Sequence, residues 1–480
     1  MSKDAPGRRP DDDRTRPEAP IPEGVRDRPV VRADGGIAGP RRPGLTRLHV
    51  ALIVAGMMLG FSVAPLYQVA RDDPSNKDYD LWQQTGRIVL DGRDIYPRTQ
   101  QLFPFMYPPA CATMLAPLSV LPRGAFVAAL LTLNSASWTA CILLSVYLAT
   151  GRFRGNRPEL YLLPSLAVIP FVHDTYLLGQ PALLLLALLL GAFACLRRAR
   201  PGWAGALLAT ATAIKAFPLL AAGYLVYRRQ WRATAAMGLT LVGLMFVAPL
   251  AFRAPSRVGE DFVLWARGML FKYDEGAIAQ RPYRSYSYKN QSIQATVHRL
   301  ARPVLADGEA DRSWRVNLLS LDFRQTTLLM LGSVAALGVY YLWSTRGARG
   351  QAEPADAAEQ AMATLLLVMF SPLSFNYMYV WMMFPLAVLL HLAASAPGGS
   401  AIRRTALGLV AASVTLLALA IPMRRVAQAY GSVFFSGLVL LIGLGWILRR
   451  NWIAQALPST SGSRHAPSPL RAGGRTAASS

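Results

Sequence analysis

Charged residues are scarce in this sequence of 480 residues, of which 16% are charged and 53% are hydrophobic. A soluble protein usually carries about 25% charged residues. Several apolar blocks reach the roughly 20 residues that a helix needs to cross ~30 Å of hydrocarbon. The blocks are 49–70, 124–150, 159–172, 181–196, 203–227, 233–252, 326–343, 361–370, 378–394, 405–422 and 433–448. The chain is therefore expected to be an integral membrane protein.

Cysteine and histidine are also few. The three cysteines lie in or beside apolar blocks and show neither a disulfide framework nor a metal-binding spacing. The five histidines form no H-x-x-x-H pair, so we predict no metal site. Stretches such as Leu183 to Ala194 lack polar–apolar alternation, which excludes the strands of a membrane barrel.

Acidic residues are outnumbered, and the net charge is +23. This charge does not indicate a nucleic-acid partner, because the basic residues sit in short clusters at block ends. That distribution is typical of cytoplasmic loops. The clusters are Arg152/Arg154/Arg157, Arg197/Arg198/Arg200, Arg228/Arg229/Arg232, Arg346/Arg349, Arg403/Arg404 and Arg449/Arg450.

The order of blocks and clusters predicts an all-α, polytopic helical bundle of about 12 membrane segments. Residues 1–45 and 455–480 are expected to be disordered cytoplasmic tails, because they contain few large apolar side chains. The membrane domain is expected to span 46–454, with two large extracytoplasmic loops at 71–123 and 253–323.

Residues 201–227 lie between two basic clusters and are too short for two full crossings. We therefore expect a hairpin of two half-length helices, broken near Lys215 to Pro218. One conflict with the charge pattern remains, because this scheme places Arg424 and Arg425 outside.

Asp78 and Asp80 follow the first crossing closely, in a segment whose residues 79–90 have the pattern of an amphipathic helix. A carboxylate near the outer face could accept the proton of a sugar hydroxyl or hold a divalent metal. On a helix the two carboxylates would point to nearly opposite faces. The alternative is a solvated acidic loop.

Lys215 lies inside an apolar run. Charge within the membrane is costly and usually faces a cavity or a partner. The ammonium could neutralise a lipid phosphate as a point charge, or it could snorkel or form a buried ion pair.

Breaks in the apolar pattern at Tyr107-Pro108-Pro109 and at Ser371-Pro372-Leu373-Ser374 indicate an outward-facing cavity rimmed by irregular backbone. Gln180 could bind a sugar, although Gly179-Gln180-Pro181 also fits an ordinary helix start. Asn290 and Gln291 could bind a sugar or lie in a mobile loop.

Taken in order, these segments resemble glycosyltransferase family 87 from about residue 78 to about residue 390. The segments that carry the resemblance are Asp78-Tyr79-Asp80-Leu81-Trp82, Leu90-Asp91-Gly92-Arg93-Asp94-Ile95-Tyr96, Tyr107-Pro108-Pro109, Pro117-Leu118-Ser119-Val120-Leu121-Pro122, Gly179-Gln180, Ala213-Ile214-Lys215-Ala216-Phe217-Pro218, Asn290-Gln291-Ser292 and Ser371-Pro372-Leu373-Ser374. The sequence departs from the family pattern in two places. Ala182 stands where the family often has Asn, and Phe375-Asn376-Tyr377-Met378 stands where it usually has histidine.

The resemblance implies a GT-C-like fold in the plasma membrane and a polyprenyl-phosphate sugar donor, with mannose as the expected sugar. The acceptor would be a lipid or a glycan, and the reaction would be inverting and would require no metal. Asp78 would be the general base and Lys215 would lie near the donor phosphate, while Asn376 or Tyr377 would replace the missing histidines. The further substrate-binding candidates are Asp80, Tyr107, Gln180, Asn290, Gln291 and Ser374. A transporter or lipid flippase, or an inactive relative, remains the alternative.

Overall fold

The computed structural model describes residues 45–73, 77–98, 104–280, 284–307, 314–346 and 353–450. Within these ranges the chain forms helices and no strands, so the all-α class is confirmed. Isolated bridges join Tyr273 to Ile278 and Asn290 to Phe375. Apart from Leu45, the two expected tails lie outside the described residues.

Seven helices in the described part of the chain are long and apolar enough to cross a membrane. They are α1 (Arg47–Ala70), α4 (Arg123–Thr150), α10 with its continuation (Trp231–Ala251), α13 (Phe323–Thr345), η5 with α15 (Asn376–Ser395), α16 (Ala401–Leu419) and α18 (Ser432–Arg449). Each coincides with an apolar block of the sequence. They support an integral membrane protein, whereas the count of about 12 segments stays a prediction.

The shorter helices cover most of the remaining described residues. They are α2 (Lys77–Leu90), α3 (Pro109–Ser119), α5 (Glu159–Ala167), α6 (Ile169–Leu178), α7 (Ala182–Arg197), α8 (Pro201–Ile214), α9 (Ala221–Tyr227), α11 (Pro255–Trp265), α12 (Ile293–Ala301), α14 (Glu353–Phe370) and α17 (Arg424–Ala429). The expected amphipathic helix at 79–90 is present as α2. It buries Tyr79, Trp82 and Val89 on one face.

The expected break near Lys215 is confirmed. Helix α8 ends at Ile214, and Lys215 is extended, with φ −148° and ψ 132°. A 3-10 turn at Phe217–Leu220 then leads into α9. The break follows from Pro218, because proline lacks an amide donor and disfavours helical backbone before it.

Helices α5 and α6 meet at an angle of 66° and would count as an eighth span if taken together. The bend falls within the apolar block 159–172. Pro170 is the second residue of α6 and has no amide hydrogen to continue the hydrogen bonding of α5.

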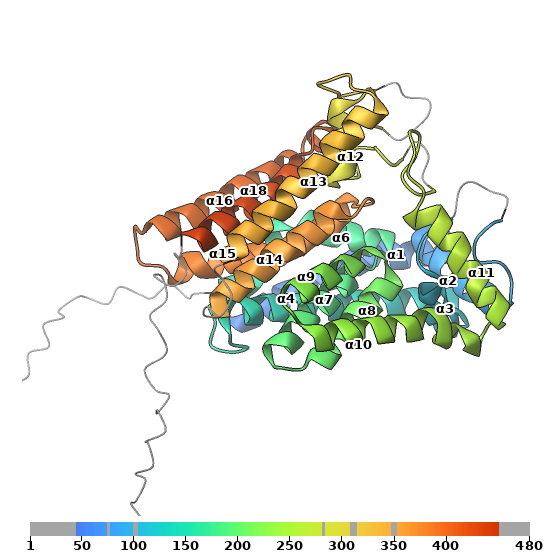
Figure 1. The fold of residues 1–480 in the computed structure, drawn as a ribbon. Coiled ribbons are helices and arrows are strands. Elements are labelled where there is room, and N and C mark those ends of the chain that lie inside the picture. The colour runs from blue at the N-terminus through green and yellow to red at the C-terminus, as the bar shows by residue number, and fades with distance from the viewer. Residues whose placement is uncertain are drawn as a thin grey trace, which may run out of the picture. The chain divides into compact units, whose positions relative to one another are not determined.

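Burial separates the long helices into two groups. Only 17% of the apolar windows of α1 and α13 is buried, against 78% for η5 with α15 and 67% for α18. Helix α18 packs against both α14 and α16, and α15 packs against α4 and α16 (Figure 1). Helices α1 and α13 therefore present apolar side chains outward, as lipid-facing helices do, while α15 and α18 form the interior.

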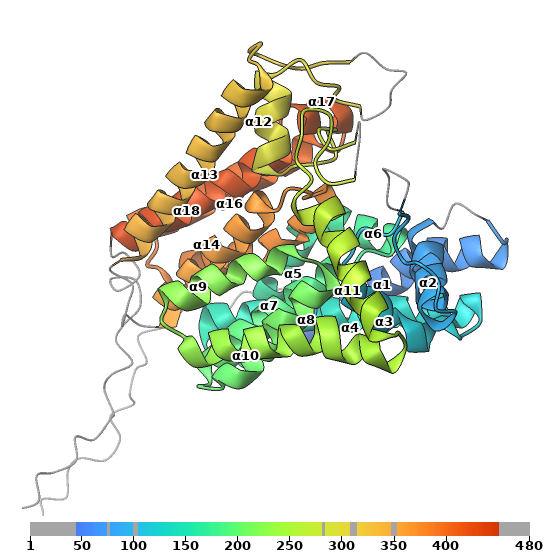
Figure 2. The same cartoon turned by 45° about the vertical axis from the view of Figure 1, so that its right-hand side comes forward.

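Helix α8, which leads to Lys215, packs between α7 and α10 (Figure 2). The contact with α10 is close because Gly205 has no side chain. A Cβ at this position would lie 2.6 Å from the Met237 amide nitrogen and would also overlap the Ala233 carbonyl oxygen. Gly205 therefore sets the distance between the two helices.

Substituting Gly205→Ala is expected to push α8 away from α10 and to lower the free energy of unfolding by about 1–3 kcal/mol, the usual cost of overpacking. Gly202→Ala, on the same helix with open space around its Cβ position, serves as the matched control. Thermal unfolding in detergent should show a lower midpoint for Gly205→Ala only. Equal midpoints for the two variants would contradict the close contact.

Candidate active site

A cavity of about 290 Å³ lies where three irregular segments meet, and we call it the lysine cavity. Two of these segments are the breaks predicted from sequence at Tyr107–Pro108 and at 371–373, and the third is the break after α8. Its lining residues are Met106, Tyr107, Pro108, Lys215, Ala216, Phe217, Leu219, Leu220, Trp265, Met269, Leu270, Ala279, Phe370, Ser371, Pro372, Leu373, Phe375 and Tyr377. The structure therefore brings the predicted breaks into one cavity.

Lys215 supplies positive charge to this largely apolar cavity. Its Nζ lies 5.7 Å from the centroid of the Tyr107 ring and 5.5 Å from that of Tyr377. It also lies 3.8 Å from the Met378 sulfur. Aromatic faces attract a cation, so the two rings favour an ammonium group next to the cavity.

A hydrogen-bonded series connects Tyr107 to Asp78. The Tyr107 hydroxyl donates to Gln180 Oε1 at 2.9 Å, and Gln180 Nε2 donates to Asp78 Oδ2 at 2.8 Å. The two bonds fix the orientation of the Gln180 amide, and the amide in turn holds the Asp78 carboxylate. Three of the predicted site residues therefore lie together, and the Tyr107 ring joins them to Lys215.

The position of Gln180 depends on Gly179, which ends α6 in the left-handed conformation at φ +65°. A Cβ on Gly179 would also lie 3.0 Å from the Tyr79 ring. The Tyr79 hydroxyl donates to the Tyr176 carbonyl at 2.7 Å, which holds α2 against α6. Glycine is required here by both backbone conformation and space.

Asp80 lies apart from this series. Its carboxylate accepts two bonds from the Arg123 guanidinium, at 2.8 and 2.9 Å. Asp78 and Asp80 thus have different partners, as expected for two residues separated by two positions on a helix.

Asn290, Gln291 and Ser374 lie buried among backbone partners. Asn290 Nδ2 donates to the carbonyls of Ser285 and Pro372, and the backbone N–H of Gln291 donates to the Ser374 carbonyl. Ser374 Oγ donates to the Val368 carbonyl. These contacts join segment 284–292 to segment 371–376, which contributes residues to the lining of the lysine cavity.

Asn376 and Tyr377 are neighbours in the chain that face different surroundings. Tyr377 lines the lysine cavity. Asn376 Nδ2 instead donates to Asp174 Oδ2 at 2.9 Å, on α6. The two residues predicted to replace the family histidines therefore lie on opposite sides of one turn.

The conflict at Arg424 and Arg425 is explained by their partners. Arg424 pairs with Asp174, and Arg425 pairs with Asp307. Asp307 comes from the segment 253–323, which was also predicted to be outside. Sequence reasoning missed these pairs because nothing in a single sequence matches residues that are more than 100 positions apart.

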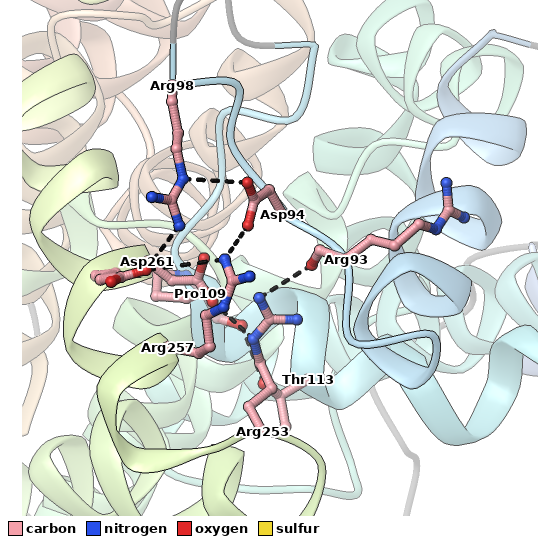
Figure 3. Close-up of polar contacts among 9 residues, drawn as sticks. Arg93, Asp94, Arg98, Pro109, Thr113, Arg253, Arg257 and Asp261 are labelled. Carbon is pink, nitrogen blue, oxygen red and sulfur yellow. Dashed lines mark hydrogen bonds and ion pairs between the residues drawn. The ribbon is translucent and has the colours of Figure 1, made fainter.

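An ion-pair cluster, which sequence reasoning also missed, fixes α11 against the segment 93–98 (Figure 3). Asp94 pairs with Arg98 and Arg257, and Arg98 pairs with Glu260. Although burial acts to raise it, the two arginines hold the pKa of Asp94 below its usual value.

Below this cluster lies a buried ion pair between Arg253 and Asp261, with Nε and Oδ2 2.7 Å apart (Figure 3). Arg253 Nη2 also donates to the Arg93 carbonyl at 3.0 Å. Helix α11 then presents Trp265 to the lysine cavity, where its Nε1 donates to the Met106 carbonyl at 3.2 Å.

Helix α12 contains a buried histidine, His298. Its Nε2 lies 2.9 Å from the Tyr273 hydroxyl, and its ring packs between Tyr286 and Phe323. Burial, reinforced by the charge of Arg302, lowers the pKa of His298 from 6.5 to about 4. The imidazole is therefore neutral in the folded protein at neutral pH.

Among the described residues, no group of three or more histidine, cysteine, aspartate or glutamate side chains could hold a metal ion. The model of glycosyltransferase family 87 matches residues 105–372 of the chain, which is more than half of its length. The search of curated proteins found no match to this chain.

Acidification is expected to destabilise the fold through His298. Between pH 6.5 and about pH 4 the unfolded chain binds a proton that the folded protein excludes, so stability falls as the pH falls through this window. The thermal midpoint should drop between about pH 7 and about pH 4.5, and it should drop less in His298→Gln. Comparing each protein with its own midpoint at neutral pH removes the effect of lost packing. Equal drops in both proteins would refute this role of His298.

Proposed function

Because the chain belongs to glycosyltransferase family 87, it is a membrane glycosyltransferase, and we propose that it transfers a hexose, mannose in particular, from a polyprenyl-phosphate sugar to a lipid or glycan acceptor. The reaction takes place at the extracytoplasmic face of the plasma membrane, with both termini cytoplasmic. The observation that carries this proposal is the series from Asp78 through Gln180 and Tyr107 to Lys215, because it joins a carboxylate to a cation beside an apolar cavity.

The lysine cavity suits a donor with a charged head and an isoprenoid tail. Leu219, Leu220 and Leu270 line it and are each about half exposed, at 46–47%. Such side chains would face lipid in a membrane, so the tail can leave the cavity between them. The donor phosphate then lies near Lys215, whose compact ammonium binds phosphate as a point charge.

Asp78 acts as the general base in this mechanism. It takes the proton of the acceptor hydroxyl, and the acceptor oxygen forms a bond to the anomeric carbon. The bond from that carbon to the phosphate oxygen breaks, and the lipid phosphate leaves with the electron pair. A single displacement of this kind inverts the configuration, and one base is sufficient for it.

We propose no resident cofactor. A lipid monophosphate can leave without a metal when a cation lies close to the developing charge, and Lys215 provides that cation. A divalent ion that accompanies the substrates is compatible with this scheme. The other predicted residues contribute to substrate binding through the segments that they hold. Asp80 fixes α2 to α4 through Arg123, and Asn290, Gln291 and Ser374 hold the segment 371–376.

The donor class is tested with purified protein in liposomes and a panel of radiolabelled polyprenyl-phosphate sugars. In that assay Asp78→Asn is expected to slow transfer by about 10²–10⁴-fold, the usual contribution of a general base. The donor KM should stay close to that of the wild type, because the amide keeps its bond to Gln180. Asp91→Asn, which changes an exposed carboxylate beyond the end of α2, is the control. Transfer at the wild-type rate by Asp78→Asn would remove the base assignment.

Lys215→Met removes the charge but keeps a long apolar side chain. The donor KM is expected to rise about 10–100-fold, because a hydrogen bond to a charged group contributes about 1.5–3 kcal/mol. Lys272→Met is the matched control, since Lys272 is exposed and pairs with Asp274. An unchanged donor KM in Lys215→Met would place the phosphate elsewhere. Failure of the wild type to use any donor on the panel would identify an inactive relative.

A further inference from the structure

A second cavity, of about 400 Å³, lies on the other side of η5 from the lysine cavity. We call it the aspartate cavity, after Asp174. It is lined by residues of α1, α5, α6, α16 and α17, by Ala420 and Ile421 after α16, and by Asn376. Its volume falls in the range of about 300–1,000 Å³ that is usual for small-molecule sites.

The polar groups of this cavity are partly unused. Asp174 Oδ2 accepts from Asn376 at 2.9 Å and from Arg424 at 3.0 Å. Among the described residues, Asp174 Oδ1 accepts no hydrogen bond, and His173 Nδ1 lies 3.9 Å away. One carboxylate oxygen therefore remains available to a hydroxyl donor.

Gln428 adds a second polar side chain to the wall of the cavity. The residue is 2% exposed, and its side-chain oxygen has no donor within the described part of the chain. Because that oxygen is itself buried, the acceptor that a ligand can reach is Asp174 Oδ1.

The charge and the walls of the cavity limit the ligand further. Arg424 neutralises Asp174, so neither an anion nor a cation is strongly favoured. Phe61 and Phe171 supply aromatic surface, and Leu417 and Ile421 supply aliphatic surface. Carboxylate, amide and guanidinium groups beside aromatic rings suit a neutral ligand that has both hydroxyl groups and apolar C–H faces.

The two cavities share one wall. Phe375 and Tyr377 line the lysine cavity, whereas Asn376 between them lines the aspartate cavity. Neither Asp78 nor Lys215 lines the aspartate cavity, so the reacting hydroxyl of an acceptor would lie outside it. We propose that the aspartate cavity binds a sugar of the glycosyl acceptor other than the one that reacts, through a hydroxyl group that donates to Asp174 Oδ1. This inference rests on the proposed function and assigns the second substrate of that reaction.

The test measures binding of radiolabelled methyl and octyl α-mannopyranoside to the protein in lipid nanodiscs. Asp174→Asn, which replaces one carboxylate oxygen by a donor, and Ala420→Phe, which fills the cavity, should each weaken binding by about tenfold or more. Arg425→Gln is the matched control, because Arg425 is next to Arg424 but pairs with Asp307 outside the cavity. Thermal midpoints identify any variant that has failed to fold.

The two glycosides distinguish the source of the sugar. Equal binding of both indicates recognition of the sugar alone, and tighter binding of the octyl form indicates a lipid-linked acceptor. In the transfer assay, Asp174→Asn and Ala420→Phe should raise the acceptor KM by about tenfold and leave the donor KM unchanged.

Three outcomes separate this inference from the proposed function. Wild-type affinity for the glycosides in both cavity variants overturns the inference, even if transfer is observed. Binding of the octyl form that is insensitive to Asp174→Asn shows recognition of the chain only and also overturns it. Glycoside binding that both variants abolish, in a protein that transfers no sugar from any donor, supports the site and refutes the proposed function.

Discussion

The arrangement of both cavities depends on one buried cation, Arg299 of α12. Its side chain is fully buried, and a charge in such a position is costly unless hydrogen bonds satisfy it. Burial lowers its pKa to about 9, so it stays protonated at neutral pH. The guanidinium donates five hydrogen bonds of 2.6–3.2 Å, to the backbone carbonyls of Tyr286, Ser287, Asn290, Gln428 and Ala429. It thereby binds two segments that are more than 130 residues apart.

Hydrogen bonds connect Arg299 to the lysine cavity. Asn290 and Gln291, which lie next to the carbonyls that Arg299 binds, are bonded to segment 371–376. The backbone N–H of Asn376 donates to the Lys289 carbonyl. That segment presents Tyr377 to one cavity and Asn376 to the other. The same cation fixes Gln428, which lines the aspartate cavity. Arg299, Asn290 and Gln291 line neither cavity, yet they hold in place residues that do.

Sequence reasoning succeeded where the signal is local. Apolar blocks marked the long helices, Pro218 marked the break at Lys215, and the spacing of Asp78 and Asp80 predicted their separate directions. It did not predict Arg299 as a buried centre, because that arginine sits in a short amphipathic helix whose burial depends on distant segments. The pairing of Asp174 with Arg424 escaped it for the same reason, and so did the aspartate cavity. Long-range contacts of this kind leave no periodic pattern in one sequence.

The Tyr107 side chain links the charged groups of the site. Its hydroxyl bonds to the Gln180 amide, which holds Asp78, and its ring faces Lys215. The Gln180 amide can make both bonds because it accepts through its oxygen and donates through its nitrogen. A shift of α2, which carries Asp78, would therefore be transmitted to Tyr107 and, through the Tyr107 ring, to Lys215. In the proposed reaction this connection keeps the carboxylate and the ammonium in one fixed arrangement beside the cavity.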